Sequence, residues 1–235
     1  MNRWQGLSYK GFVKEYQRPR YRPISPDEIL KIGMATKDLR ARCLFFFCYL
    51  TGSRISEAAQ FRSVHLSDGK PGFYQVDLLV LKKRKQRGMR RFIPIPRGER
   101  ARCHENEMMG EIITYLKDFQ ATDYPFWCWG RGEPYTKRNG RVLERKVRPD
   151  LMDIYIRRHI TLKTDAQVKS GDHWIERPME KPMHPHFLRH CRAAHLVSHY
   201  NFTDARLQQF FKWADAKIAS IYIEEGDMTS YFEGK

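Results

Sequence analysis

The chain has 235 residues, enough for one large domain or two small ones with a buried core. Hydrophobic residues make up 41% of it, an ordinary globular fraction that excludes wholesale disorder. Lysine and arginine outnumber aspartate and glutamate by 43 to 27, and the net charge of +16 indicates a polyanionic partner, nucleic acid before an anionic membrane.

The sequence also disfavours membrane insertion and secretion. The longest apolar run, Cys43–Leu50, is far shorter than the roughly 20 residues that cross a bilayer. Residues 1–16 lack an apolar signal core, and the five cysteines form no CxxC pair, which is typical of reduced thiols in a cytoplasm. We therefore expect a cytoplasmic protein with no membrane partner.

The chain begins with a basic segment and two helices. Residues 1–22 are basic and aromatic with weak periodicity, and we expect them to form an extended arm. Ser25–Glu28 has the pattern of a helix start, and this helix should run to about Ala35. Asp38 can cap a second helix, whose apolar residues recur at helical spacing until Thr51-Gly52 interrupts it.

A basic hairpin follows a short third helix, which Ser53 can cap. Asp68–Gly72 is turn-like, and Phe73–Leu81 is rich in β-forming residues. Arg91–Pro96 reads as a second strand that proline closes. The run Lys82–Lys85 stands between them, so the pattern predicts a two-stranded hairpin with a very basic tip.

The middle of the chain is the least regular part. We expect a helix over residues 107–119, an irregular stretch over 122–148, a helix over Pro149–Ile160 and a polar connection over Thr161–Met183.

The last part is predicted to be helical up to an acidic tail. One helix should run from Pro185 to about Tyr200, and Thr203 with Asp204 should open another. Asp215 can cap a final short helix that carries Tyr222. Mostly helices with one small antiparallel β-hairpin or sheet predict an α+β fold.

Several residues in these elements suit phosphate chemistry. Arg54 follows a glycine at a helix start, and His186 and Arg189 share a helix face because they are three apart. Two arginines around one phosphate stabilise the extra charge of a pentacoordinate transition state. A tyrosine such as Tyr222, with an ordinary pKa near ~10, becomes a nucleophile where cations favour its phenolate or a base assists.

These residues stand in blocks that resemble the tyrosine recombinase (phage integrase) family, and the resemblance covers residues 22–224. The sequence TGSRISE is similar to the family's TGxRxSE, which implies Arg54 as the first catalytic arginine and Glu57 as its supporting partner. HFLRH matches the family's HxLRH, which implies His186 and Arg189 as phosphate ligands and His190 as a structural neighbour.

The closing block carries the implied nucleophile. The family has a Gly-His pair before its tyrosine, and here that pair reads Lys212-Trp213, with tryptophan at the second position as in some members. The spacing from Trp213 to Tyr222 equals the family's His-to-Tyr spacing. The resemblance therefore implies Trp213 as a phosphate contact and Tyr222, rather than Tyr200 or Tyr231, as the nucleophile.

The predicted hairpin resembles the family's β-hairpin, whose lysine is the general acid for the leaving 5′-oxygen. Strand alternation places Lys83 on the same, more polar face as Asp77, which favours Lys83 and leaves Lys82 and Lys85 open. The hairpin residues expected to contact DNA are Lys82, Arg84, Lys85 and Arg87.

By this resemblance, the chain is expected to be a site-specific recombinase or integrase of a mobile element. The resemblance also implies a nucleoid-associated protein of a prokaryotic or viral host cell. Tyr222 would attack the scissile phosphate and form a 3′-phosphotyrosyl link, and a 5′-hydroxyl from a second DNA would reverse the step. Because the phosphotyrosine keeps the bond energy, no ATP, metal or other cofactor is implied. The implied partners are double-stranded DNA and further copies of the chain, a tetramer on DNA and a monomer when free.

Two alternative functions fit the same residues. A type IB topoisomerase-like relaxer needs no partner site, and a DNA-binding protein can keep the fold without strand transfer. A zinc cluster at His184, His186 and His190 beside Cys191 is disfavoured because no carboxylate or CxxC pattern accompanies it, so we predict no metal site.

The expected domain organisation is a basic N-terminal arm, residues 1–22, and a catalytic domain, residues 23–235. Typical family members carry an N-terminal core-binding domain that is absent from this sequence. Two explanations stay open, an excised catalytic domain and a naturally minimal recombinase.

Overall fold

The computed structural model describes residues 20–21, 24–80, 89–126, 135–136, 142–143, 149–170, 173–213, 218–220 and 222. Its α-helices are α2 (Pro26–Ala35), α3 (Leu39–Thr51), α4 (Ile55–Ala58), α5 (Cys103–Leu116), α6 (Pro149–His159), α7 (Pro185–Tyr200) and α8 (Asp204–Phe211). Its strands are β1 (Arg20–Tyr21), β2 (Leu66–Asp68), β3 (Phe73–Leu79), β4 (Arg90–Pro96), β5 (Tyr135–Thr136), β6 (Val142–Leu143), β7 (Thr161–Ser170) and β8 (His173–Pro182). This arrangement confirms the predicted, mostly helical α+β fold.

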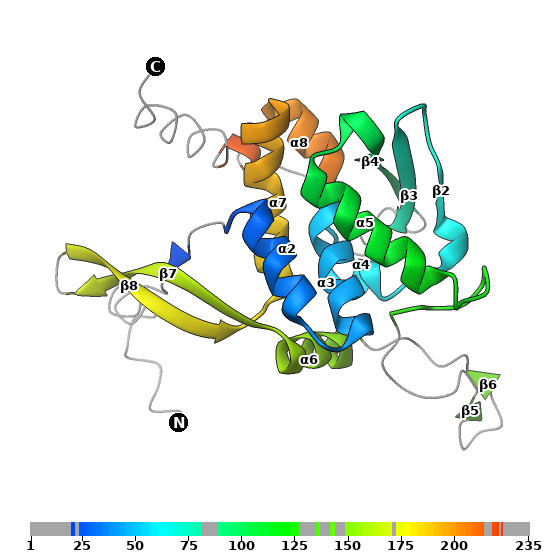
Figure 1. Cartoon of the computed structure of the whole chain (residues 1–235), viewed down its shortest axis with the longest axis horizontal. Helices are drawn as coiled ribbons and strands as arrows, with labels where there is room; N and C mark the ends of the chain where they lie inside the picture. Colours follow the sequence, from blue (N-terminus) through cyan, green and yellow to red (C-terminus); the bar gives the residue numbers. More distant parts are fainter. Residues whose placement is uncertain are drawn as a thin grey trace, which may run out of the picture.

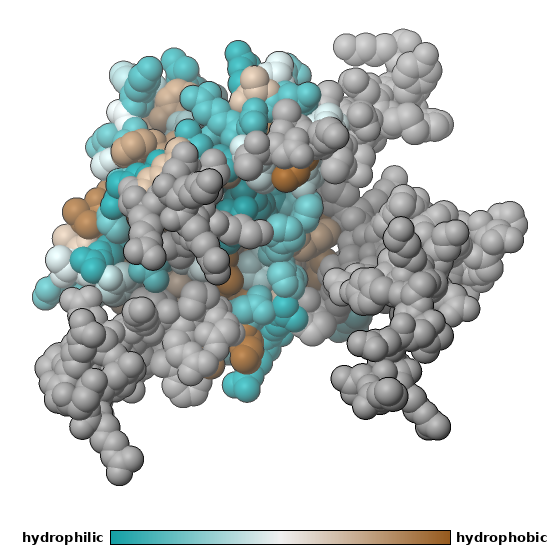
Figure 2. Space-filling model, turned by 180° about the vertical axis from the view of Figure 1, so that it is seen from behind, coloured by the Kyte–Doolittle hydropathy of each residue, from teal (hydrophilic) through white to brown (hydrophobic). Residues whose placement is uncertain are grey.

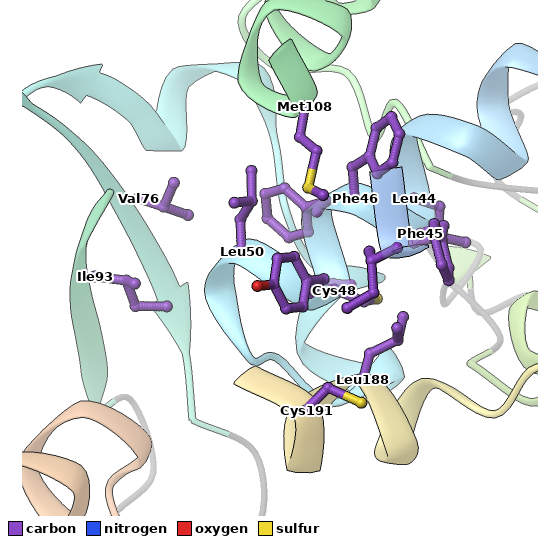
Figure 3. Packing of buried hydrophobic residues seen from close by; sticks show 14 of the residues in the cluster. Leu44, Phe45, Phe46, Cys48, Leu50, Val76, Ile93, Met108, Leu188 and Cys191 are labelled. Carbon is purple, nitrogen blue, oxygen red and sulfur yellow. The ribbon is translucent and has the colours of Figure 1, made fainter. Parts of the chain in front are cut away.

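Helix α3 lies at the centre of the hydrophobic core. Every residue from Cys43 to Thr51 is buried, so this helix is apolar on all sides rather than amphipathic. Figure 3 shows its side chains surrounded by Met108 of α5, by Val76 and Ile93 of the sheet and by Leu188 of α7. The central position of α3 explains why its C-terminal end can carry backbone groups into the site described below.

Of the three N-caps predicted for the first three helices, two are confirmed. Ser25 forms a capping box with Glu28, whose N–H donates to Ser25 Oγ at 3.2 Å. Asp38 caps α3 by accepting the N–H of Ala41 at 2.7 Å. The assignment of Ser53 as a cap is wrong, because Arg54 has the extended N-cap conformation and its N–H donates to Glu57. The Glu57 carboxylate thus shifts the start of α4 by one residue.

The predicted basic hairpin is confirmed as strands β3 and β4, but its sheet has three strands rather than two. Leu66–Asp68 forms β2, which pairs antiparallel with β3. Three residues are too few to show a period of two, so the sequence carries no strong signal for this strand. The basic tip, residues 81–88, lies outside the described residues.

The polar connection predicted over Thr161–Met183 is wrong. Strands β7 and β8 form a long hairpin there, paired from Thr161 with Pro182 to Ser170 with His173, and β1 adds to its edge. In Figure 1 this hairpin extends away from the helical core. The sequence of this segment has no regular alternation of apolar and polar residues, and this explains why a periodicity analysis missed the strands.

The later helices are confirmed, although both ends of α5 differ from the prediction. The helix expected over 107–119 begins at Cys103 and ends at Leu116. Residues 218–220 and 222 are helical, as predicted for the final segment. Asp215, the tail from residue 223 onward, most of the irregular stretch 122–148 and nearly all of the arm lie outside the described residues.

On the face seen from behind, the described residues are mainly hydrophilic. Figure 2 shows that the coloured part of this face is mostly teal, with separate brown residues between. Within the described part of the chain, no helix combines the length and the apolar character needed to cross a bilayer.

Candidate active site

A buried carboxylate organises the first part of the site. Glu57 on α4 is 2% exposed and forms ion pairs with two arginines, to Arg54 Nη1 at 2.9 Å and to Arg91 Nη2 at 3.2 Å. Its Oε2 also accepts the backbone N–H of Arg54 at 3.1 Å. Arg54 is held by both its main chain and its side chain, while 26% of that side chain is exposed and can be reached by a ligand.

Arg189 enters the same region from the first turns of α7. It is 2% exposed, and its Nη1 donates to the carbonyl of Gly52 at 2.5 Å and its Nη2 to the carbonyl of Phe211 at 3.0 Å. Its guanidinium also lies 4.5 Å from the centroid of the Phe211 ring. These contacts use two of the five N–H donors of an arginine and fix the plane of the guanidinium.

Trp213 and Tyr222 close the other side of the site. Their rings stack with centroids 5.5 Å apart and planes 8° apart, and Trp213 in turn stacks on Phe211. Tyr222 is 6% exposed, and its hydroxyl is hydrogen-bonded to Nδ1 of His190. The tyrosine singled out by spacing is therefore held between an indole and an imidazole.

His186 and His190 stand one turn apart on α7. Their rings meet edge to face with centroids 4.7 Å apart, and His184 caps the helix by accepting the N–H of His186 at 3.1 Å. Of the described residues predicted for the site, Arg54, Glu57, His186, Arg189, His190, Trp213 and Tyr222 all lie in this one assembly. His184, considered above only as part of a disfavoured zinc cluster, is the N-cap of α7.

The electrostatics of the assembly favour an anion. Burial, followed by the positive charges of Arg91 and Arg54, lowers the pKa of Arg189 to about 9. Partial burial and the neighbouring His190 and Arg189 lower the pKa of His186 to about 4. Burial is the larger cause of both shifts and the cationic neighbours add to it, and a bound phosphate would balance the positive charges gathered here.

Arg91 is a member of the assembly that the sequence analysis did not identify. It is 1% exposed, and its Nη1 donates to the carbonyl of Phe210 at 3.1 Å. A signal was present, because Arg91 alternates with Ile93 and Ile95 on the same face of β4, and a charge on an apolar strand face requires a buried partner.

Two backbone conformations allow the elements to meet. Gly52 ends α3 in the left-handed region with φ 56°, and a Cβ there would overlap the ring of Phe211. Lys212 ends α8 in the same region with φ 51°. The left-handed turn at Lys212 redirects the chain so that Trp213 faces Tyr222.

The hairpin residues predicted to contact DNA lie outside the described residues; they are Lys82, Arg84, Lys85 and Arg87. Lys83, the lysine favoured as the general acid, lies outside them as well. Within the described ranges, no group of three histidine, cysteine or acidic side chains is arranged to hold a metal ion. The chemistry available to the described groups is phosphate binding by guanidinium groups beside a tyrosine hydroxyl.

Comparison with known proteins gives a family and a fold. The model of the family described as "Phage integrase family" matches residues 23–228, which agrees with the resemblance of the sequence blocks. No curated protein matches the sequence significantly.

Among solved structures, the chain is similar to the XerA recombinase, with 16% identity and a TM-score of 0.53 over 93% of this chain and 66% of that one. It is also similar to the XerH site-specific recombinase bound to palindromic difH substrate in a post-cleavage complex, with 16% identity and a TM-score of 0.50 over 93% of this chain and 54% of that one. The chain thus spans less than two thirds of each of these structures, and the likeness concerns the fold.

Proposed function

The chain belongs to the phage integrase family, and from this premise we propose that it is a site-specific recombinase that cuts and rejoins double-stranded DNA through a 3′-phosphotyrosyl intermediate. One observation carries the proposal: Tyr222 contacts both His190 and Trp213, and the guanidinium of Arg189 lies over the ring of Trp213. A tyrosine that served only the core would not need buried arginines nearby.

In this proposal, Arg54 and Arg189 bind the non-bridging oxygens of the scissile phosphate, with His186 and Trp213 as further contacts. The guanidinium of Arg189 is already oriented by two carbonyls, so little reorganisation is needed when charge develops on the phosphate. Because Tyr222 is 6% exposed, DNA reaches its hydroxyl only after a local rearrangement of the side chains around it.

The proton of Tyr222 passes to His190 in the attack step. Burial, followed by the charge of Arg189, lowers the pKa of His190 below its usual range, so the imidazole is neutral and its Nδ1 can accept a hydrogen bond from Tyr222. The phenolate oxygen then bonds to phosphorus, the bond to the 5′-oxygen breaks, and Lys83 donates a proton to that oxygen. The reaction needs neither metal nor ATP because the phosphotyrosyl bond keeps the energy of the bond that breaks.

The test uses a pool of nicked suicide duplexes with randomised sequence. The protein is incubated with the pool, adducts that resist SDS are isolated, and their DNA is sequenced to identify the preferred duplex. We expect wild type and Tyr200→Phe to form the adduct and Tyr222→Phe to form none. An adduct that persists in Tyr222→Phe would refute the nucleophile, and no adduct with any duplex would favour the binding-only alternative.

The remaining roles extend the same proposal. Lys83 is tested with a 5′-thio leaving group, which should restore cleavage to Lys83→Ala but not to Arg54→Ala, because a thiolate leaves without a proton. Residues 23–235 form the catalytic unit, which acts as a tetramer on DNA in the cytoplasm of its host cell. Relaxation of supercoiled plasmid without strand exchange between two duplexes would favour the topoisomerase-like alternative.

A further inference from the structure

Arg91 connects three elements that carry the proposed site. It lies on β4, its Nη2 pairs with Glu57 on α4, and its Nη1 donates to the carbonyl of Phe210 on α8. Figure 1 shows β4 beside α8 at the same end of the molecule. An arginine can bridge two acceptors in this way because its planar guanidinium presents donors in a fixed fork.

The first connection controls Arg54. Glu57 uses Oε1 for the Arg54 guanidinium and Oε2 for both the Arg54 backbone and Arg91. If Arg91 were absent, Oε2 would lose its side-chain partner in a dry environment, and the carboxylate could turn fully toward Arg54. Arg91 therefore shares the negative charge of Glu57 and keeps the guanidinium of Arg54 from being held by a second oxygen.

The second connection controls the C-terminal end of α8. The last carbonyls of a helix have no partner within the helix and carry a partial negative charge. Arg91 donates a hydrogen bond to the carbonyl of Phe210, and Arg189 donates one to the next carbonyl, that of Phe211. Two residues later the chain reaches Trp213, which stacks on Tyr222. The position of Arg91 thus affects both Arg54, through Glu57, and Trp213, through the end of α8.

Arg91 also keeps the site cationic. The guanidinium groups of Arg54 and Arg91 pair with the carboxylate of Glu57, and that of Arg189 is close enough to interact electrostatically with all three. The Nε–H of Arg91 has no acceptor among the described residues. A buried excess of positive charge is costly without an anion to balance it. From these contacts we propose that Arg91 is a positioning residue of a phosphate site, acting through Glu57 and through the end of α8. This proposal deepens the recombinase function proposed above and rests on it.

The first experiment measures binding of inorganic phosphate to the whole chain, followed by thermal unfolding at increasing phosphate concentration. Arg91→Met should weaken phosphate binding by about fivefold or more, because charge-assisted contacts are lost or misplaced. The matched control is Arg90→Met, since Arg90 is the next residue on β4, is 38% exposed and pairs with Asp77. It should change the affinity by less than about twofold. Equal affinities of Arg91→Met and wild type would overturn the proposal.

The second experiment measures the single-turnover rate of adduct formation on the nicked duplex enriched from the randomised pool. Arg91→Met should lower the rate on the order of 10–100-fold, the effect of a small misplacement of catalytic groups. In an Arg54→Ala background the same change should cost less than it does in wild type, because only the connection through the end of α8 remains. An equal loss in both backgrounds would indicate a general structural role and overturn the proposal.

A second variant covers the case in which Arg91→Met does not fold. Arg91→Lys keeps the charge but cannot bridge Glu57 and Phe210 at once, so it should fold and still show reduced phosphate affinity and cleavage rate. Full phosphate affinity and full rate in Arg91→Lys would overturn the proposal. If wild type forms no adduct with any duplex while the Arg91 variants still lose phosphate affinity, the recombinase function fails and the positioning role stands.

Discussion

The indole of Trp213 lies parallel to the phenol of Tyr222, with ring centroids 5.5 Å apart and planes 8° apart. The same indole packs against Phe211, so it joins the end of α8 to the helical segment that carries Tyr222. Because Trp213 is itself buried, the ring acts as a wall that fixes one face of the tyrosine. The position of the proposed nucleophile therefore depends on an aromatic stack.

Loss of this stack should reduce both stability and activity. Trp213→Ala is expected to lower the free energy of unfolding by about 3–5 kcal/mol, the usual cost of removing a buried tryptophan. Trp213→Phe should retain most of the stability and part of the adduct yield. Chemical denaturation and the suicide-duplex assay measure the two effects. Phe92→Ala is the control, since that ring is 60% exposed and should change stability by less than about 0.5 kcal/mol.

Alanine substitutions at two glycines with the same backbone conformation should distinguish the cost of backbone strain from the cost of a side-chain clash. Gly52 and Gly98 have φ of 56° and 60°, but only a Cβ at Gly52 would meet another side chain, that of Phe211. Each alanine substitution should lower the free energy of unfolding by about 1 kcal/mol, because a residue with a Cβ is disfavoured in the left-handed conformation. Gly52→Ala should cost roughly 1–3 kcal/mol more, because Phe211 must move. It should also lower adduct formation, since the Gly52 carbonyl orients Arg189. Equal losses for both variants would contradict this account.

Lys212 occupies the position where the family has glycine, and its left-handed conformation supplies a reason for that glycine. Lys212→Gly should raise the free energy of unfolding by about 0.5–1 kcal/mol, because a side chain is disfavoured at φ 51°. Asn201, at the end of α7, has the same φ. Asn201→Gly should bring a smaller gain because asparagine tolerates this region. Thermal unfolding of the two variants provides the comparison.

The pH dependence of cleavage tests the role of His190. Its lowered pKa means that it remains neutral as the pH falls through the usual histidine value, so the rate of adduct formation should stay level there and decline only at lower pH. His190→Gln should remove this decline along with most of the rate. His199→Gln changes a histidine at the far end of α7 and should leave the profile as in wild type. A wild-type rate that declines at the ordinary histidine pKa, about 6.5, would argue against His190 as the proton acceptor.

A second histidine should govern stability rather than cleavage. His195 is buried and hydrogen-bonded to the Tyr49 hydroxyl at 2.9 Å, and burial, followed by Arg192, lowers its pKa to about 3. The unfolded chain therefore takes up a proton first, at its ordinary pKa of about 6.5. The free energy of unfolding should fall as the pH drops from there toward about 3, by at most about 1.4 kcal/mol per pH unit from this group. His195→Gln should make this decline shallower in denaturant titrations at several pH values.

Local patterns in the sequence were sufficient for most of the helices. The capping box of Ser25 and the cap at Asp38 depend on contacts between residues three positions apart, so a short stretch of sequence contains both partners. The motif blocks likewise identified Arg54, Arg189 and Tyr222 by their order and spacing. The assignment of Lys83 as the general acid and the catalytic roles of all these residues are predictions from the motif blocks.

The tertiary structure decided what no local pattern contains. The bond from Arg91 to the carbonyl of Phe210 joins residues 119 positions apart, and that from Arg189 to Gly52 spans 137. Such contacts depend on how α3, α4, α8 and the sheet pack, because a buried guanidinium takes whichever carbonyl or carboxylate the packing brings within reach. The long hairpin β7–β8 escaped prediction for a different reason, since no regular alternation of apolar residues in the sequence accompanies its backbone pairing. The sequence by itself determined which residues are available for phosphate chemistry, and the packing of distant elements decided which of them share one site.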